Sequence, residues 1–172
     1  MNNHNLAKKI KEVSQLKGSF LLRSGVTSDT YFDKYQFESD PSILKEVAEG
    51  MVPLIPSDTE ILAGLELGGI PLAVMLGQIL GLKVAFIRKK AKEYGTQQFA
   101  EGPELAGRKI VLVEDVVTSG SAILDATNAL RHQGIDVSLA VCVIDRESGG
   151  KENLAAINVK LKALFSATQI MG

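Results

Sequence analysis

Two neighbouring acids and a loop of small residues stand together in the segment from 110 to 122. The aliphatic run Ile110 to Val113 predicts a strand buried on both faces, and Glu114 and Asp115 stand where that strand is expected to end. A helical pattern begins directly after the loop. Because the first turn of a helix offers free N–H groups and a partial positive charge, this segment predicts a site for a phosphorylated sugar.

The expected phosphate contacts lie in the loop and in the first turn of the helix. They are Thr118, Ser119, Gly120, Ser121 and Ala122. An alternative is an ordinary helix start, capped by a hydroxyl side chain of the loop. Two adjacent carboxylates repel each other and are costly to bury, so the acid pair favours a functional role, in which it accepts hydrogen bonds from sugar hydroxyls.

A second strand-to-helix turn, at 64–71, contains Glu66, Gly68 and Gly69. Glycines can adopt positive φ and expose their N–H groups, so this turn is a candidate cradle for a pyrophosphate. The alternative is a tight turn before a helix that starts at a proline.

A cationic run opens with Arg88 and Lys89 and includes Lys92. Such runs are usually solvated, and some bind nucleic acid. This one follows a predicted buried strand and begins about twenty residues without a regular pattern, so 88–108 is predicted to be a mobile lid. A cationic lid suits a reaction in which a multiply charged anion leaves.

Two further segments carry cations near aromatic or acidic residues. Arg23, Tyr31 and Phe32 belong to a predicted hairpin, which could simply pack an aromatic pair. Arg146 follows Asp145 at the end of another predicted strand; its side chain suits a carboxylate, although a surface pair is the alternative.

Composition and pattern limit the class of protein. The 172 residues are 45% hydrophobic with a formal net charge of −1, which gives no reason to expect nucleic acid or a membrane as partner. The lone Cys142 is expected in the core, and the polar N-terminus lacks a signal-peptide pattern, so a cytoplasmic protein is predicted.

Strands and helices alternate from residue 41 onward, after an opening helix and two short strands expected at 19–23 and 30–37. This alternation predicts a single α/β domain with a parallel sheet flanked by helices. The expected strands are 60–65, 83–87, 109–114, 137–144 and 160–165, and the expected helices are 41–54, 69–80, 121–133 and 152–158.

The segment 110–122 resembles the phosphoribosyl-pyrophosphate (PRPP) signature of the type I phosphoribosyltransferases. The cationic run, the hairpin and the Asp-Arg pair are similar to those of the orotate phosphoribosyltransferases. This resemblance implies a hood over the base site at 1–40, a PRPP-binding core at 41–172 and a mobile catalytic loop at 88–108. It also implies transfer of the phosphoribosyl group to orotate, with Mg²⁺ held mainly through PRPP, in a homodimer with shared active sites.

On this resemblance the catalytic residues are Lys92, Arg88, Lys89 and Asp115. The other site residues bind substrate: Glu114 the ribose, residues 118–122 the 5′-phosphate, Glu66, Gly68 and Gly69 the pyrophosphate, and Arg23, Tyr31, Phe32 and Arg146 the base. Tyr94 stands where many members have His, Gly68 where some have Lys, and the C-terminal segment is short. Two alternatives remain: a phosphoribosyltransferase for another base, and a non-catalytic PRPP-sensing regulator.

Overall fold

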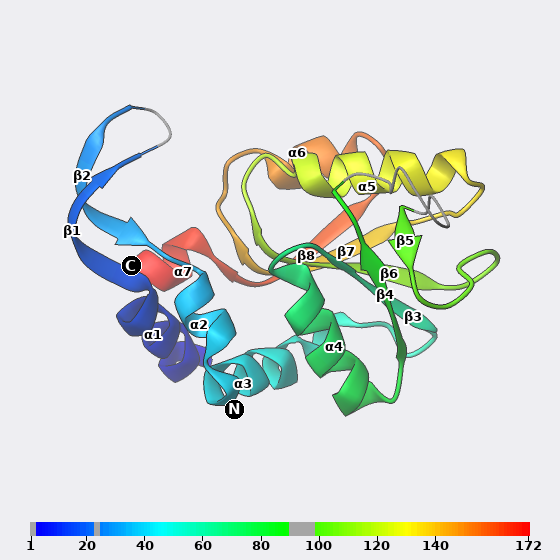
Figure 1. Cartoon of the computed structure of the whole chain (residues 1–172), viewed down its shortest axis with the longest axis horizontal. Coiled ribbons are helices and arrows are strands. Elements are labelled where there is room, and N and C mark those ends of the chain that lie inside the picture. Colours follow the sequence, from blue (N-terminus) through cyan, green and yellow to red (C-terminus); the bar gives the residue numbers. More distant parts are fainter. Residues whose placement is uncertain (1–2, 23–24, 90–98) are drawn as a thin grey trace.

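A six-stranded sheet lies between two layers of helices, and a hairpin projects from one end of the molecule (Figure 1). The structure is a computed structural model that describes residues 3–22, 25–89 and 99–172. The predicted α/β fold, with a mostly parallel sheet flanked by helices, is confirmed.

The central sheet has the strand order β5-β4-β3-β6-β7-β8. All neighbouring strands are parallel except β5, which pairs antiparallel with β4 at the edge. The strands are β3 (Ile61–Leu65), β4 (Lys83–Ile87), β5 (Ala100–Glu101), β6 (Ile110–Val117), β7 (Leu139–Asp145) and β8 (Lys160–Ser166). Strand β3 is buried along its whole length, as expected of a strand covered on both faces.

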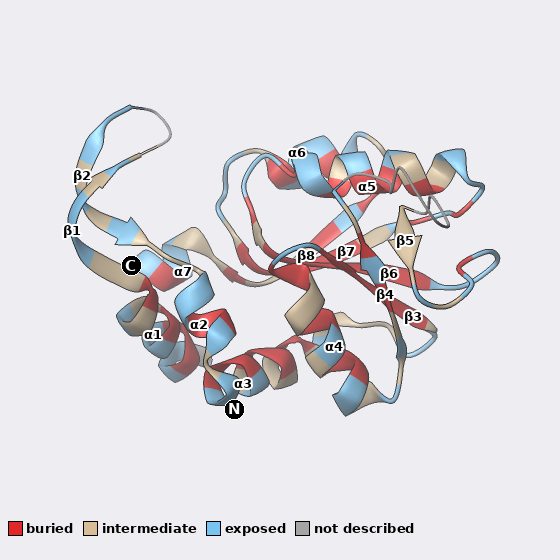
Figure 2. Ribbon diagram, viewed as in Figure 1, coloured by how far each residue is buried: buried red, intermediate tan, exposed pale blue. Residues whose placement is uncertain are grey.

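Helices cover both faces of this sheet. On one face lie α3 (Pro41–Met51) and α4 (Gly69–Leu80), and on the other α5 (Ser121–His132) and α6 (Gly150–Ala155) (Figure 1). The sheet and the inward sides of the helices are buried, which gives one apolar core on each face (Figure 2). Asp40 caps α3 as its sequence indicates, because its Oδ1 accepts hydrogen bonds from the N–H groups of Ser42 (2.9 Å) and Ile43 (3.1 Å).

The N-terminal part differs from its prediction. Its elements are α1 (Asn3–Ser14), β1 (Gln15–Leu21), β2 (Thr27–Phe32) and α2 (Tyr35–Ser39), with a 3-10 turn at Val52–Leu54 after α3. The strand expected over 30–37 ends at Phe32, because the next residues turn into α2 and bury Phe37 in the core. A short C-terminal helix, α7 (Ala167–Met171), was not predicted and packs beside α1.

Strand β6 continues past the acid pair, so the expectation that it ends at those acids is wrong. Its pairing with β3 stops at Val113, whereas its pairing with β7 continues to Val117. Glu114 and Asp115 therefore lie inside a strand, at the point where its neighbour on one side has already ended. Their side chains gain access to the space beyond β3 without leaving the sheet.

The second half of segment 88–108 is tied to the sheet. The N–H of Arg88 donates to the carbonyl of Phe99 (2.9 Å), β5 pairs with β4, and Leu105 is buried. The sequence did not show this pairing because only two residues form β5. Residues 90–98 lie outside the described part, so the mobility of the loop stays a prediction.

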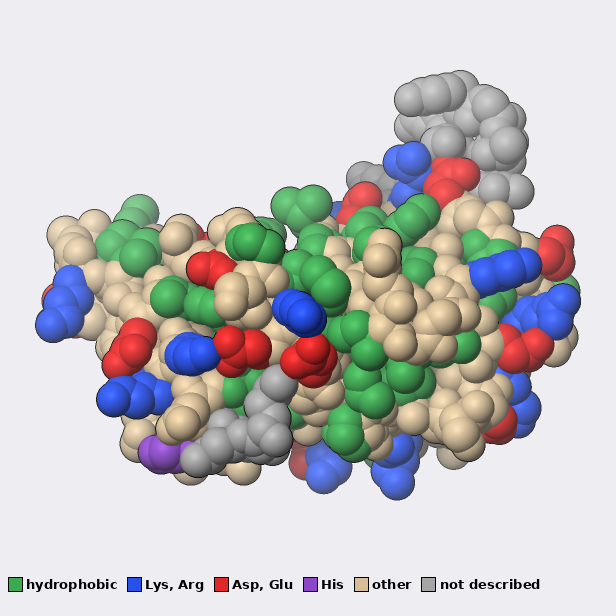
Figure 3. Space-filling view, turned by 90° about the horizontal axis from the view of Figure 1, so that it is seen from below, with side chains coloured by type: hydrophobic (Ala, Val, Ile, Leu, Met, Phe, Trp, Pro, Cys, Tyr) green, Lys and Arg blue, Asp and Glu red, His purple; other side chains and the backbone are tan. Residues whose placement is uncertain are grey.

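Charged side chains of both signs are interspersed on the face that carries α1, α3 and α4 (Figure 3). Several of them pair, as Lys9 Nζ does with Glu46 Oε1 at 2.7 Å. None of the described helices has the length and apolar character needed to cross a bilayer. Cys142 is buried in β7, as expected.

Candidate active site

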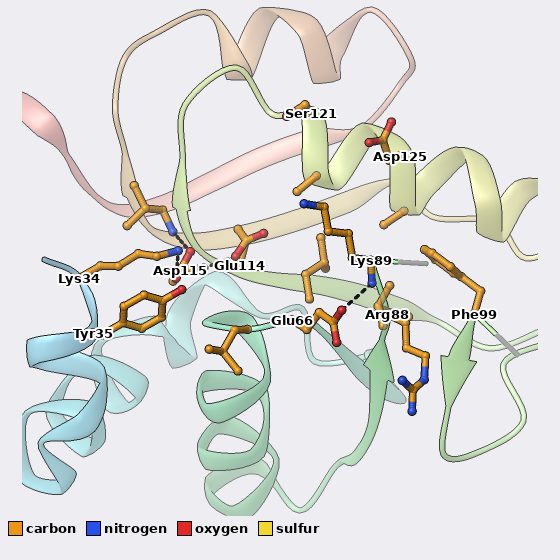
Figure 4. A pocket seen from close by; sticks show the side chains of 16 residues that line it. Lys34, Tyr35, Glu66, Arg88, Lys89, Phe99, Glu114, Asp115, Ser121 and Asp125 are labelled. Atoms are coloured by element: carbon orange, nitrogen blue, oxygen red, sulfur yellow. Dashed lines mark hydrogen bonds and ion pairs between the residues drawn. The ribbon is translucent and has the colours of Figure 1, made fainter. Parts of the chain in front are cut away.

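A cavity of about 370 Å³ opens at the carboxyl ends of β3, β4 and β6, beside the start of α5 (Figure 4). Ligands of α/β sheets bind at this edge, where a strand end meets a helix start. Seven of the predicted site residues line it: Glu66, Arg88, Lys89, Glu114, Asp115, Ser121 and Ala122. Nine further lining residues were not predicted, and those with polar or aromatic side chains are Lys34, Tyr35, Phe99 and Asp125.

The loop before α5 leaves the first turn of that helix open. Gly120 adopts φ +78° and is the N-cap residue, and no side chain caps the helix. The alternative of a cap by a loop hydroxyl is therefore wrong. Thr118 and Ser119 are exposed, and a small hollow of about 50 Å³ lies against this loop with Glu114 on its wall. The arrangement suits a phosphate, because backbone N–H groups face it at the positive end of the helix dipole.

Helix α6 supports this loop from behind. The side-chain amide of Asn153 donates to the carbonyl of Ser119 (3.0 Å). A Cβ at Gly150 would lie 2.6 Å from the carbonyl oxygen of Thr118, so the loop packs directly on the backbone of α6. The loop before α5 is thus held in place by α6.

The second turn requires glycines because the backbone of β6 and the side chain of Asp115 lie very close to it, and not because these glycines adopt a positive φ. Gly68 has φ −76°, and Gly69 is also outside the left-handed region, so that expectation is wrong. A Cβ at Gly68 would lie 1.7 Å from Asp115 Oδ2, and one at Gly69 would lie 2.2 Å from the carbonyl oxygen of Val113. The turn, which contains a cis peptide between Glu66 and Leu67, is pressed against β6. A lysine at position 68 does not fit beside Asp115 in this arrangement.

Asp115 is the centre of a buried charge cluster. It is fully buried, and its Oδ2 lies 2.5 Å from the ammonium of Lys34, while Glu114 is 7% exposed. The N–H of Val116 donates to Asp115 Oδ1, and the N–H of Asp115 donates to Glu114 Oε1 (2.9 Å). Glu38, on α2, completes the cluster, because its carboxyl group lies beside that of Asp115 and interacts with it.

The cluster sorts its carboxyl groups into neutral and ionised ones. Burial, and then the contact with Asp115, raises the pKa of Glu38 and that of Glu114 to about 9. Burial works to raise the pKa of Asp115 too, but hydrogen bonds from Glu114, Glu38 and Lys34 outweigh it and lower that pKa below its usual range. Burial works to lower the pKa of Lys34, yet its bond to Asp115 raises it on balance. At neutral pH, Asp115 is therefore the ionised carboxylate, paired with the Lys34 cation.

Lys34 and Glu38 were missed by the sequence analysis. Lys34 falls within the strand predicted over 30–37, and Glu38 falls between that strand and the helix predicted over 41–54. No pattern of spacing links them to residues 114–115, and only the tertiary structure, in which α2 packs on α1 and α3, brings them to Asp115.

The two described cations of the run that opens the loop, Arg88 and Lys89, differ in direction. Lys89 extends into the cavity, and its backbone N–H donates to Glu66 Oε1 (2.9 Å), which joins the second turn to the end of β4 (Figure 4). Arg88 points away and its Nε lies 3.2 Å from Glu101 Oε1. Lys92 and Tyr94 lie outside the described residues.

The predicted base-binding residues do not all lie in one place in the structure. Phe32 and Arg146 line a separate hollow of about 70 Å³, whose other walls include Ala167 and Ile170 of α7. Tyr31 points to the opposite face of the hairpin and contacts the ring of Phe20, with 5.5 Å between the ring centroids. Arg23 lies outside the described residues. Helix α7, which the sequence analysis did not predict, thus contributes to the place where a base is expected.

Comparison with known proteins agrees with this geometry. The phosphoribosyl transferase domain matches residues 36–164. The chain belongs to the phosphoribosyltransferase family. An orotate phosphoribosyltransferase from Nocardioides sp. is 47% identical to this phosphoribosyltransferase over 165 residues, which cover 96% of this chain and 92% of the relative. One from Methanocella arvoryzae is 40% identical over 168 residues, covering 97% and 96%.

A solved structure shares the whole fold. The crystal structure of Mycobacterium tuberculosis orotate phosphoribosyltransferase in complex with Fe(III) dicitrate matches this phosphoribosyltransferase with a TM-score of 0.89. The two are 26% identical, and the match covers 99% of each chain. The resemblance stated from the sequence is confirmed for both family and fold.

Proposed function

We propose that this phosphoribosyltransferase transfers the phosphoribosyl group of PRPP to orotate, giving orotidine 5′-monophosphate and pyrophosphate, a step of de novo pyrimidine synthesis. The observation that carries the proposal is the placement of Arg146 beside Phe32, at the end of the strand that pairs with β6, together with a cavity that has an uncapped helix start and an acid pair. Arginine suits the orotate carboxylate, and an aromatic ring suits a flat base. The names of the closely similar relatives point to the same substrate.

The described residues divide PRPP among them. The start of α5, from Thr118 to Ala122, takes the 5′-phosphate, and the Glu114–Asp115 pair takes the ribose hydroxyls. The turn at 66–69 and the Lys89 side chain take the pyrophosphate. The assignments follow from the chemistry of each wall: N–H donors and cations face phosphates, and carboxyl oxygens face hydroxyls.

No covalent nucleophile is needed. An orotate nitrogen attacks C1′ as the bond to pyrophosphate breaks, through an oxocarbenium-like state, and the bond electrons leave with the pyrophosphate. The chain contributes position and charge: Lys89, with Lys92 of the same loop, neutralises the charge that develops on the leaving group, whereas Arg88 pairs with Glu101. Closure of the loop would exclude water from the reacting carbon.

Mg²⁺ fits this site as a substrate-bound ion. The described residues contain no group of three His, Cys, Asp or Glu side chains placed to hold a metal. Magnesium is commonly bound through substrate phosphates, waters and one or two carboxylates, and Asp125 offers one on the cavity wall. When bound, the ion neutralises part of the charge of PRPP.

We further propose a cytoplasmic homodimer in which each loop serves the neighbouring site. Large apolar side chains are exposed at Leu67, beside the cavity, and at Leu21 and Val26 of the hairpin, where a second copy could cover them. The shared site itself is implied by the resemblance to the orotate phosphoribosyltransferases.

A panel of bases tests the substrate. With PRPP and Mg²⁺, we expect turnover of orotate and none of uracil, adenine or hypoxanthine. Arg146→Ala should weaken orotate binding by roughly tenfold to a hundredfold, because it removes a charge-assisted contact, and should leave PRPP binding unchanged. Arg108→Ala is the matched control, since Arg108 pairs with Glu60 on the surface. Turnover of another base would establish a different transferase, and PRPP binding without turnover would favour a sensing regulator.

A further inference from the structure

Glu38 is a buried carboxyl group for which the proposed reaction has no use. It lies on α2, directly after Phe37 in the core, and is 7% exposed. Its Oε1 is buried and meets no hydrogen-bond donor among the described residues. A proton on Glu38 resolves this, because the group can then donate to the Asp115 carboxylate that it contacts.

Lys34 reaches the same carboxylate from the start of α2. Its Nζ lies 2.5 Å from Asp115 Oδ2, and its side chain is 32% exposed where it borders the cavity. The other charged groups of the cluster are Asp33, which acts on Glu38, and Glu114, which acts on Asp115 and Lys34; both are acids. Lys34 is therefore the cation that balances the cluster, and Glu38 is its neutral hydrogen-bond donor.

Lys34 and Glu38 contact the Asp115 carboxylate from outside its own strand, β6. Gly68 leaves the space that Asp115 Oδ2 occupies, so the glycine turn does not fix that oxygen with a side chain. Without Lys34 and Glu38, Asp115 would be a buried charge with only backbone and Glu114 contacts. A carboxylate in that condition takes up a proton or rotates away.

We propose that Lys34 and Glu38 are positioning residues that fix the Asp115 carboxylate for the ribose of PRPP, and so link the hood segment to the sugar site. Lys34 follows Phe32 of the base hollow by two residues, so one short segment reaches both substrates. This inference rests on the proposed function in one respect, that Glu114 and Asp115 bind the ribose.

The test compares two substitutions of Glu38 that have nearly the same length. Glu38→Gln keeps a neutral donor, and Glu38→Met removes it. For Glu38→Met we expect the Kd for PRPP, measured by calorimetry, and the KM for PRPP to rise about tenfold, while kcat and the KM for orotate change little. For Glu38→Gln we expect PRPP binding within about threefold of the unmodified protein. A merely structural role of Glu38 would lower stability without this selective change in PRPP binding.

The controls make each outcome decisive. Glu46→Gln and Glu46→Met alter a surface carboxylate that pairs with Lys9, and should leave PRPP binding unchanged. Should Glu38→Met fail to fold, Lys34→Met, at a partly exposed position, must raise the Kd for PRPP about as much. Unchanged PRPP affinity in a folded Glu38→Met or Lys34→Met protein overturns the inference. Failure of the unmodified protein to bind PRPP would instead overturn the proposed function.

Discussion

Asp115 can occupy the floor of the cavity because the residue opposite it has no side chain. Its Oδ2 lies where a Cβ of Gly68 would be, and its negative charge is paired with the ammonium group of Lys34. Position 68 thus carries a glycine, and the space in front of it is occupied by the carboxylate of Asp115. A buried Asp115 therefore needs two features around it: a glycine at position 68, which leaves room for its carboxylate, and Lys34 at the start of α2, which supplies the opposite charge.

Gly68→Ala should therefore weaken PRPP binding, although it adds only one methyl group. The added methyl group overlaps Asp115 Oδ2, and relieving such overpacking costs about 1–3 kcal/mol. We expect the Kd for PRPP, measured by calorimetry, to rise roughly tenfold or more. Gly50→Ala in α3 is the control, because its methyl group would meet only the flexible ends of the Leu164 and Leu6 side chains. Equal PRPP binding by the two variants would contradict this account.

At the scale of elements, α7 forms one wall of the hollow that contains Phe32 and Arg146, where we propose that the base binds. Ser166 caps it, the side chain of Gln169 accepts a hydrogen bond from the Ser166 N–H, and the Glu147 carboxylate accepts two hydrogen bonds from Thr168. Those bonds place a helix of five residues firmly beside Phe32 and the strand end that carries Arg146.

Ala167→Leu should narrow that hollow. The hollow is only about 70 Å³, so three added carbon atoms reduce the room next to Arg146. We expect the KM for orotate to rise severalfold while the Kd for PRPP stays the same. Ala155→Leu, at an exposed position of α6, provides the comparison. If steady-state assays show an unchanged KM for orotate, α7 does not border the bound base.

At the scale of the whole molecule, the buried cluster makes stability depend on pH. The pKa of Glu38 and of Glu114 rises from 4.5 to about 9 on folding. Between these values the folded chain binds more protons than the unfolded one, so the free energy of unfolding falls as pH rises from about 5 to 9. The lowered pKa of Asp115 acts in the opposite direction, and only in the acid range below its ordinary value of 3.8.

Glu38→Gln should make this pH dependence shallower. The substitution removes one titrating group, so the free energy of unfolding should change less steeply with pH, by at most about 1.4 kcal/mol per pH unit. Urea unfolding at pH 5, 7 and 9 measures the slope, with Glu46→Gln as the exposed counterpart. Parallel slopes for Glu38→Gln and the unmodified protein would mean that Glu38 is already ionised in the folded state.

Assembly is the other property of the whole molecule. If the loop acts across a dimer interface, a mixed dimer of Lys92→Ala and Asp115→Asn chains has one site with both changes and one with neither. Mixing these two inactive variants should then restore activity to about a quarter of the unmodified level, since about half of randomly exchanged dimers are mixed and each has one intact site. Lack of recovery after proven subunit exchange would show that Lys92 serves its own subunit.

The sequence by itself determined the features that depend on neighbours along the chain. Apolar runs and the Asp40 cap predicted the strands and helices, with α4 and β4 at the bounds observed. The acids and small residues of 114–122 predicted the sugar-phosphate site that we propose, because a strand followed by a small-residue loop and a helix start is a local arrangement.

Only the tertiary structure decided which distant residues meet. The continuation of β6 past its acids depends on β7, and the two-residue strand β5 depends on β4. The contact of Lys34 and Glu38 with Asp115 joins segments about eighty residues apart. A charged residue in a short polar stretch looks solvent-exposed in the sequence. It becomes a buried partner only where the packing of another element removes its water and supplies the opposite charge.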